Sequence, residues 1–337
     1  MRGQTIHPEA ARYERELGRG LLASVSRSFY LSLRVLPAPV RGPMSLSYLL
    51  ARASDTIADA SEAVADPKAR IELLDRLGTV VNGNADGRFF EEAAAMLGTR
   101  HDHAGETALM HRLRDCHDWL SLLDDGTQKL VREVLRLIFE GQRLDLERFE
   151  VPTQKPQALS SAAELDEYTY LVAGSVGEFW TAICQLLLDR PYSRDQQEML
   201  GLAIEFGKGL QLINIIRDCP KDLSTGRCYL PVGDTVTKLD GPAFQPFLET
   251  TLQTARQRLE AGKRYVEATN NLRLRFAAAL PLALALKTST ALEGANWAVL
   301  EKGVKVSRPE VKSLLVQLAW RSLRRNWIGG FLERLAS

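Results

Sequence analysis

Apolar residues three and four positions apart recur along most of the chain, which is the spacing of one face of an α-helix. The alternation of β-branched residues that is typical of strands is nearly absent. Clusters of Pro, Gly and Ser interrupt the helical pattern, for example LPAPVRGP and SRP. The pattern therefore predicts an all-α fold. Helices are expected at roughly 8–24, 41–62, 67–80, 88–98, 106–122, 126–149, 162–189, 195–219, 242–269, 272–300 and 309–335.

The expected helices follow one another without a long or compositionally biased linker. A chain of 337 residues can form two average domains, but helical enzymes of this length also occur as one domain around one core. We therefore expect a single domain over residues 1–337, folded as a helical bundle.

Composition and charge exclude several classes of protein. Hydrophobic residues make up 45% of the chain and charged residues 25%, as in an ordinary globular protein. Forty-three Lys and Arg against 42 Asp and Glu give a net charge of +1, so no overall field recruits nucleic acid, and no nucleic-acid partner is expected. The four cysteines lack a CxxC pair, which predicts reduced thiols and a cytoplasmic location. The N-terminal segment lacks the apolar stretch of a secretory signal, and the longest apolar run, 276–286, is too short to span a bilayer.

Two segments, ARASDTIAD and NIIRDCPKD, carry aspartates four residues apart: Asp55 with Asp59, and Asp218 with Asp222. Residues at this spacing lie one turn apart on the same face of a helix, where two carboxylates repel unless a cation joins them. Mg²⁺ suits this role, because it binds one or two carboxylates together with substrate phosphates. Two such pairs can hold a diphosphate through magnesium and promote its departure. Chance alone gives roughly five acidic pairs at this spacing, most of them on solvated faces.

Each aspartate pair has an arginine close by. Arg52 precedes Asp55 by three residues, and Arg217 directly precedes Asp218. Such an arginine can form an ordinary surface salt bridge, but it can also hold phosphate oxygens with two parallel hydrogen bonds.

These segments belong to a longer ordered set. YLLARASDTIAD (48–59), DEYTYLVAGSVG (166–177), LQLINIIRDCPKD (210–222) and GRCYLP (226–231) resemble the motifs of the squalene and phytoene synthase family. SRSF resembles the family's N-terminal motif, and KGVKVSR resembles a C-terminal segment of squalene synthases. The resemblance runs from about residue 24 to 310, nearly the whole chain, and several motifs in order are far more specific than one aspartate pair.

The resemblance implies an isoprenoid-synthase helical bundle with a central cavity and two or three Mg²⁺ ions held by Asp55, Asp59, Asp218 and Asp222. It implies a set of further site residues around the diphosphates and the reaction centre. These are Arg52, Arg217, Ser26 and Arg27 at the diphosphates or their metal shell, Tyr48, Tyr168, Gln211 and Asn214 around the reaction centre, and Val172 and Gly174 at the substrate.

The chemistry of this family makes these residue types intelligible. Departure of diphosphate from an allylic carbon leaves a carbocation, which an aromatic face can stabilise without attacking it. Tyr168 suits this role, and its hydroxyl can take part in the proton loss that closes a cyclopropane ring; from spacing alone, a packed helix tyrosine is the plainer interpretation. Gly174 and Gly177 allow either close helix packing or room for a prenyl chain, and the family placement favours the second.

The resemblance to squalene synthases implies a condensation of two farnesyl diphosphates, followed by reduction with NADPH. Without a reductant the product would be a dehydrosqualene or phytoene type, and capture of water would give an alcohol. No GxGxxG follows a strand, so NADPH would not sit in a Rossmann site. Lys302, Lys305 and Arg308 in KGVKVSR are the candidate ligands of its phosphate, with a solvated loop as the alternative.

The chain departs from the family pattern at three positions. Ala58 and Lys221 stand where family members often carry an extra acid. Pro220 lies inside the second aspartate motif and lacks a backbone donor, so the helix is expected to kink or end there.

Other interpretations remain open at this point. A non-catalytic helical scaffold predicts no dependence on Mg²⁺, and a terpene cyclase would convert one farnesyl diphosphate without forming a thirty-carbon product. His101, His103, His111 and His117 cluster in sequence and provide a weaker candidate metal site. At the C-terminus, Trp320, Trp327 and Phe331 alternate with arginines, which predicts at most peripheral contact with a membrane, or packing back onto the protein.

Overall fold

The computed structural model describes residues 8–26, 29–84, 86–98, 104–149, 156–238 and 241–336. Within these residues almost every segment is helical, and the one sheet is a parallel pair of two-residue strands. The predicted all-α fold is confirmed. The chain packs as two compact units: unit 1 contains Met1–Glu147 and Leu186–Leu188, and unit 2 contains Arg148–Gln185 and Asp189–Ser337. The single domain stays a prediction.

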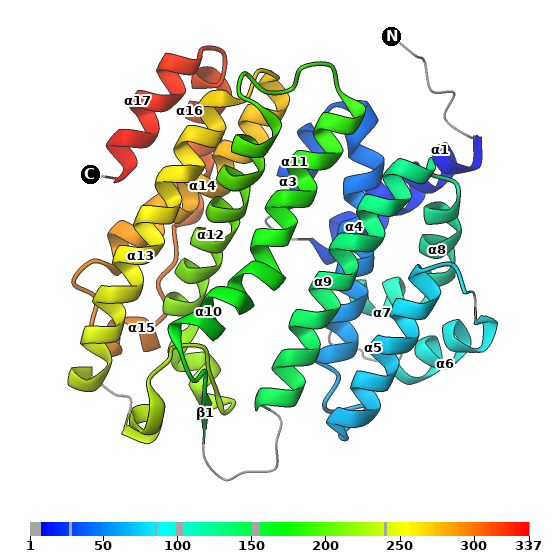
Figure 1. The fold of residues 1–337 in the computed structure, drawn as a ribbon, viewed down its shortest axis with the longest axis horizontal. Helices are drawn as coiled ribbons and strands as arrows, with labels where there is room; N and C mark the ends of the chain where they lie inside the picture. The colour runs from blue at the N-terminus through cyan, green and yellow to red at the C-terminus, as the bar shows by residue number, and fades with distance from the viewer. Residues whose placement is uncertain are drawn as a thin grey trace. The chain divides into compact units, whose positions relative to one another are not determined.

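Unit 1 contains most of the helices in the first half of the chain (Figure 1). Its elements are α1 (Pro8–Arg15), the π-helix η1 (Glu16–Leu21), α2 (Leu22–Val25), α3 (Tyr30–Val35), α4 (Ala38–Ala58), α5 (Pro67–Val81), α6 (Gly87–Leu97), α7 (Ala104–His111), α8 (Leu113–Ser121) and nearly all of α9 (Asp125–Phe149). The buried face of α4 forms the centre of its core, because this helix packs on α2, α3, α5, α7 and α8.

Unit 2 is built around α12, which packs along α13 over most of its length. Its elements are β1 (Gln157–Ala158), α10 (Ala162–Thr169), the π-helix η3 (Tyr170–Gly174), α11 (Ser175–Leu187), α12 (Gln196–Ser224), β2 (Arg227–Cys228), the 3-10 helix η4 (Gly233–Lys238), α13 (Gly241–Ala268), α14 (Leu272–Leu292), α15 (Trp297–Glu301), α16 (Arg308–Arg321) and α17 (Arg325–Ala336). In Figure 1, α13 and α14 run beside α12, and α17 lies next to them.

The predicted helices agree with the observed ones except at local breaks. The stretches 106–122, 272–300 and 309–335 each contain two helices, separated by a turn that the apolar spacing did not reveal. Between α14 and α15 the break is at Gly294, whose φ of +69° lies in the left-handed region that favours glycine. The short helix α3 was not predicted.

The sequence predicted that the helix would kink or end at Pro220, and it does not end there. α12 continues through Pro220 to Ser224, so Asp218 and Asp222 both lie within it. The cost of the missing donor is local, because α12 as a whole is held by its packing against α13 and η3.

Two stretches of unit 2 are long and apolar enough to cross a membrane by length and composition: Ala162–Leu187 and Gln196–Ser224. The core helices of soluble proteins pass the same test. The second stretch is 61% buried inside the protein over its most apolar window, and it carries Lys208 and both aspartates of the second motif. Packing in the core of unit 2 accounts for its apolar composition.

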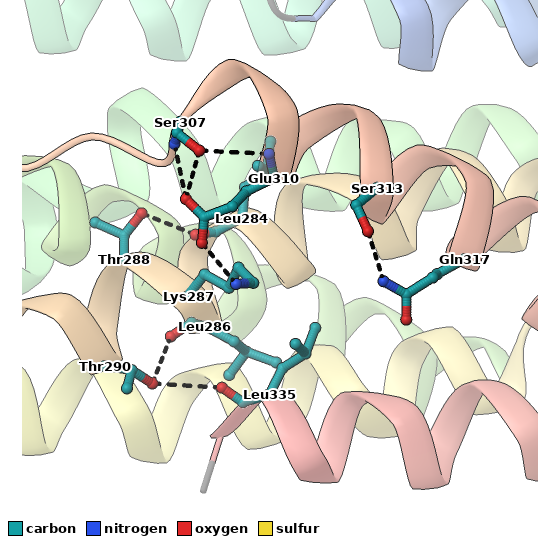
Figure 2. Close-up of polar contacts among 10 residues, drawn as sticks. All are labelled: Leu284, Leu286, Lys287, Thr288, Thr290, Ser307, Glu310, Ser313, Gln317 and Leu335. Carbon is teal, nitrogen blue, oxygen red and sulfur yellow. Dashed lines mark hydrogen bonds and ion pairs between the residues drawn. The ribbon is translucent and has the colours of Figure 1, made fainter.

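A capping box begins α16 and ties it to α14 (Figure 2). Ser307 accepts from the backbone N–H of Glu310, and the Glu310 carboxylate accepts from the backbone N–H and the hydroxyl of Ser307. Lys287 of α14 donates to the same carboxylate over 3.0 Å. These contacts, led by the Ser307 hydroxyl, lower the pKa of Glu310 to about 2.

Replacing Glu310 by Gln is therefore expected to lower the melting temperature of the chain at neutral pH. Since the folded carboxyl has a lowered pKa, its stabilising effect is complete above its ordinary pKa and is lost as the pH falls toward about 2. Melting curves across this range should show the two proteins converge at low pH. Gln317→Ala is the control, because it removes only the exposed contact with Ser313 (Figure 2). A Glu310→Gln effect that persists unchanged at the lowest pH would contradict this account.

Candidate active site

The first aspartate motif forms a polar stripe along α4. Tyr48, Arg52, Asp55 and Asp59 are spaced by four, three and four residues, so they lie on one side of the helix and its C-terminal cap. The opposite side is buried core, including Leu49, which fixes the rotation of the helix. Asp59 is exposed, while Tyr48, Arg52 and Asp55 are half-buried.

Two side chains from other helices of unit 1 hold this stripe in place. Arg52 donates to Asp55 over 3.4 Å and also forms an ion pair with Glu106 of α7. Gln142 of α9 donates to the other oxygen of the Asp55 carboxylate. Gln142 itself is buried, and its own carbonyl oxygen has no hydrogen-bond partner within the part of the chain that the structure describes. The sequence analysis missed Glu106 and Gln142, because only the fold brings them to α4.

The Asp55 carboxyl is desolvated although solvent still reaches it. Burial raises its pKa to about 6, against the opposing charge of Arg52 and with a further contribution from Asp59. Yet 44% of the side-chain surface remains accessible. A desolvated carboxylate next to a second one is stabilised by a bound cation, and the accessible surface leaves a path for that cation.

The second aspartate motif forms a similar stripe on α12. Gln211, Asn214, Asp218 and Asp222 are spaced by three, four and four residues and are all half-buried. Arg217 donates through its Nε to Asp218 over 2.9 Å and through Nη2 to the second oxygen of the same carboxylate. Burial and the neighbouring charge of Asp218 raise the pKa of Asp222 to about 6. The two motifs therefore share one design: paired carboxylates, one with a raised pKa, beside an arginine.

Tyr168 lies in an aromatic cluster of unit 2. Its side chain is buried, and its ring stacks on Tyr229 at a centroid distance of 4.7 Å. Phe149 contacts the other side of this cluster, with its ring 5.1 Å from that of Tyr229. Tyr229 belongs to the GRCYLP segment, so two of the sequence motifs meet here.

Tyr170, which the sequence analysis did not select, has a more polar setting than Tyr168. It begins the π-helix η3, its hydroxyl donates to Glu178 over 2.9 Å, and the ammonium of Lys208 lies 5.9 Å from its ring centre. π-Helical turns are frequent at functional sites. The sequence did contain a signal for this polar setting. Lys208 lies within the apolar stretch of α12, and a buried charge requires partners.

Lys208 is part of a buried charge cluster that fixes α10 against α12 and α13. It donates to Asp166 over 2.8 Å, and Arg258 of α13 forms a second ion pair with the same carboxylate. Against the effect of burial, these two cations hold the pKa of Asp166 below its ordinary value. These ion pairs hold the junction of α10 and η3 in place. They thereby position Tyr168, near the end of α10, and Tyr170, the first residue of η3.

The remaining predicted substrate residues fall into two groups. Ser26 caps the end of α2, is buried, and has a hydroxyl without a hydrogen-bond partner among the described residues, whereas Arg27 lies outside them. Val172 is half-buried and Gly174 buried, both in η3. A Cβ on Gly174 would lie 3.1 Å from the Tyr170 ring and 3.3 Å from the Lys208 side chain.

The predicted nucleotide ligands lie on the segment between α15 and α16. Lys302 caps the C-terminal end of α15, and Arg308 begins α16. The side chains of Lys302, Lys305 and Arg308 are exposed, and no ion pair joins them to a carboxylate of the described residues. α15 packs on α12, the helix that carries the second aspartate motif.

His111 and His117, the two described members of the histidine cluster, interact with groups other than a shared metal site. His111 interacts with the carbonyl oxygen of Gly98 at 3.1 Å, and His117 with Asp118 at 3.1 Å. His101 and His103 lie outside the described residues. Among the residues that the structure describes, no group of three or more His, Cys, Asp or Glu could hold a metal ion. The aspartate motifs supply two carboxylates each, which suits Mg²⁺, since this ion usually completes its octahedral shell with water and substrate phosphates.

Known proteins match the chain over most of its length. The family model of squalene/phytoene synthase matches residues 22–310. A 15-cis-phytoene synthase of Synechocystis sp. is 25% identical over 90% of this chain and 84% of its own length. A presqualene diphosphate synthase of Zymomonas mobilis is 29% identical over 61% of this chain and 56% of its own length. A ligand complex of TcSQS has a TM-score of 0.71 at 19% identity, over 97% of this chain and 90% of the other.

At such low identity the solved structure supports the fold, and the family model, which covers far more than half of the chain, assigns the family. The confirmed fold is therefore the all-α isoprenoid-synthase fold. With the two aspartate motifs, the aromatic cluster and the family match together, the chain belongs to the squalene/phytoene synthase family of prenyltransferase-type enzymes.

Proposed function

We propose that this chain is a squalene synthase, which joins two farnesyl diphosphates head to head to presqualene diphosphate and reduces that intermediate to squalene with NADPH. Family members act on prenyl diphosphates with a divalent metal. The observation that carries the proposal is the repeated stripe on α4 and α12, with two aspartates one turn apart and an arginine bonded to the first aspartate in both.

The aspartates fit magnesium by their chemistry. Asp55 with Asp59 and Asp218 with Asp222 offer hard oxygen ligands, and in each pair one carboxyl has a pKa raised to about 6. When bound, magnesium supplies positive charge that neutralises the diphosphate as its C–O bond breaks. Arg52 and Arg217 bond to these carboxylates and so fix their orientations. Their other N–H groups can donate to phosphate oxygens.

The apolar and aromatic residues have a separate role. The bond electrons leave with the diphosphate, so the allylic carbon becomes cationic, and the double bond of the second farnesyl chain attacks it. An aromatic ring stabilises this charge without offering a reactive lone pair. We assign this role to Tyr168 and its stacked neighbour Tyr229, with Tyr48 assigned to the first substrate. Loss of one proton closes the cyclopropane ring, and the departing diphosphate and a tyrosine hydroxyl are the bases available.

Substrate positions follow from the same stripes. Gln211 and Asn214 precede Asp218 on α12, so their amides can hydrogen-bond the diphosphate or its hydration shell. The unpartnered hydroxyl of buried Ser26 is a further donor, and Arg27 is assigned with it. Val172 and Gly174 in η3 are assigned to the prenyl chain. The four cysteines are buried free thiols, which supports a cytoplasmic location.

NADPH, when bound, supplies the hydride for the reductive step. Lys302, Lys305 and Arg308 suit its phosphates, because three exposed cations without carboxylate partners lie within one short segment. The packing of α15 against α12 ties this segment to the helix of the second aspartate motif.

The identity of the product tests the proposal. Purified protein is incubated with farnesyl diphosphate and Mg²⁺, with and without NADPH, and the products are identified by mass. We expect squalene with NADPH, and without NADPH presqualene diphosphate or the dehydrosqualene type of product that forms from it. The resemblance to the Synechocystis 15-cis-phytoene synthase favours a second candidate, a synthase that forms a dehydrosqualene or phytoene type of product. That product in the presence of NADPH would replace our proposal, as would an alcohol from capture of water.

Replacing Lys305 and Arg308 together by Ala is expected to lower squalene output at least about tenfold while presqualene diphosphate accumulates. The first half-reaction should be unchanged, because neither residue belongs to the aspartate motifs. The measurement is the ratio of the two products at saturating farnesyl diphosphate. Ala at Lys129 and Arg273, two exposed cations elsewhere, serves as the control. Unchanged squalene yield in the Lys305 and Arg308 variant would remove this segment from the cofactor site.

A further inference from the structure

The outer face of α16 and α17 combines large apolar side chains with high exposure. Val316, Trp320, Leu323 and Trp327 are 72%, 65%, 51% and 38% exposed. Val316 and Trp320 are one helical turn apart, and the rings of Trp320 and Trp327 stack at 6.2 Å between centroids. We call these four exposed side chains the tryptophan face.

The same two helices also have an inner face, so the exposure of the tryptophan face is not a sign of poor packing. Leu314, Leu318, Ile328, Phe331 and Leu332 are buried against the rest of unit 2. α16 packs on α14, and α17 packs on α13 and α14. The apolar residues of this region thus divide into a buried set and an exposed set on opposite sides of the helices.

The chain segment that carries the tryptophan face is basic, although Glu267 of α13 lies against buried Gly329 of α17. The stretch 311–332 contains four Lys or Arg and no acidic residue. Arg324 is exposed and lies 4.7 Å from the Trp327 ring, and Lys312 is exposed one turn before Val316. The flanking acids are already paired, Glu310 with Lys287 and Glu333 with Lys263.

We propose that the tryptophan face docks on an anionic lipid surface. Indole rings favour the boundary between water and hydrocarbon, and the long stems of Arg and Lys let their charges reach lipid phosphates beside them. Attraction to anionic lipid adds about a factor of five for each basic residue near the surface. Charge complementarity also argues against a second copy of this chain, since two identical basic faces would repel each other.

This inference goes beyond the proposed function and does not depend on it, because lipid binding is measured without substrate or cofactor. If the chain makes an apolar thirty-carbon product, a lipid-docked enzyme would release that product beside the only phase that dissolves it. A failed lipid test leaves the product assay unaffected, and a failed product assay leaves the lipid test unaffected.

The test is co-sedimentation of the full chain with vesicles of phosphatidylcholine alone and of an equimolar mixture with phosphatidylglycerol. We expect binding to the mixed vesicles that weakens as salt is raised, and much weaker binding to the neutral ones. Trp320→Gln with Trp327→Gln should weaken binding at least about tenfold. Lys312→Gln with Arg324→Gln should weaken it to a similar extent, by about fivefold for each charge. Truncating α17 is a poorer test, since it removes the buried residues that hold the region together.

Met96→Gln with Lys129→Gln is the matched control, because it changes one exposed apolar side chain and one exposed cation of unit 1, whereas the tryptophan face belongs to unit 2. We expect this control to bind like the original chain. No binding of the original chain to mixed vesicles overturns the proposal, and so does an equal loss in the control. Concentration-dependent self-association that the tryptophan variant abolishes, without lipid binding, would assign the face to a second copy instead. The Lys312 and Arg324 variant keeps the test decisive if the tryptophan variant fails to fold.

Discussion

Replacing Asp218 by Asn is expected to lower the rate of diphosphate release from farnesyl diphosphate at least about 10²-fold, a loss typical of removing one charged group that stabilises a transition state. The side chain keeps its shape but loses the charge that a metal ligand needs, so stability should change little. The measurement is inorganic diphosphate released at saturating Mg²⁺, with melting temperature followed in parallel. Asp55→Asn on α4 should give a loss of the same order, because both stripes have the same design.

Two further variants separate the metal ligand from its neighbours. Asp218 also holds Arg217 through two hydrogen bonds, and of these two described aspartates it alone accepts from Arg217. A similar loss in Asp222→Asn would therefore assign the effect to the carboxylate pair and not to a displaced arginine. Glu62→Gln is the control, since Glu62 is an exposed acid three residues after Asp59. Activity of Asp218→Asn and Asp55→Asn close to that of Glu62→Gln would remove the aspartates from the reaction.

The aspartate stripes were predictable because their geometry is local. A spacing of three or four residues on a helix fixes which side chains are neighbours, so Asp55 and Asp59, or Asp218 and Asp222, can be paired from the sequence. The rotation of each helix was also predictable, since buried apolar residues on the opposite side set it. The fold class followed from the same period.

The partners that orient the stripes were not predictable in this way. Glu106 is 54 residues from Arg52, and Gln142 is 87 residues from Asp55. Asp166 forms ion pairs with Lys208, which is 42 residues away, and with Arg258, which is 92 residues away. No periodicity links such positions, and only the packing of the helices brings them together. For the same reason the sequence did not reveal that Tyr170 has a more polar setting than Tyr168. The two settings differ because a π-helix begins at Tyr170, and this π-helix packs on α12.

The close contact of η3 and α11 with α12 provides the second large effect. Gly207→Ala is expected to destabilise the chain by about 1–3 kcal/mol, the usual cost of overpacking a core. A Cβ on Gly207 would lie 2.3 Å from the carbonyl oxygen of Ala173, and one on Gly177 would lie 2.2 Å from that of Ala203. Both obstacles are backbone atoms, so the helices themselves must move apart. Unfolding by urea measures the loss for each variant.

Gly201→Ala on the same helix tests whether the effect arises from the helix contact or from the glycine itself. A Cβ on Gly201 meets nothing within 4 Å. Since Ala is the better helix former, this control should gain about 0.5–1 kcal/mol where Gly207→Ala loses stability. The opposite signs are expected on one helix, because position 201 is open whereas position 207 faces the backbone of Ala173 in η3. A gain at Gly207 would contradict the close helix contact, and a gain at Gly177 would favour room for a prenyl chain, the interpretation that the family placement favoured for Gly174 and Gly177.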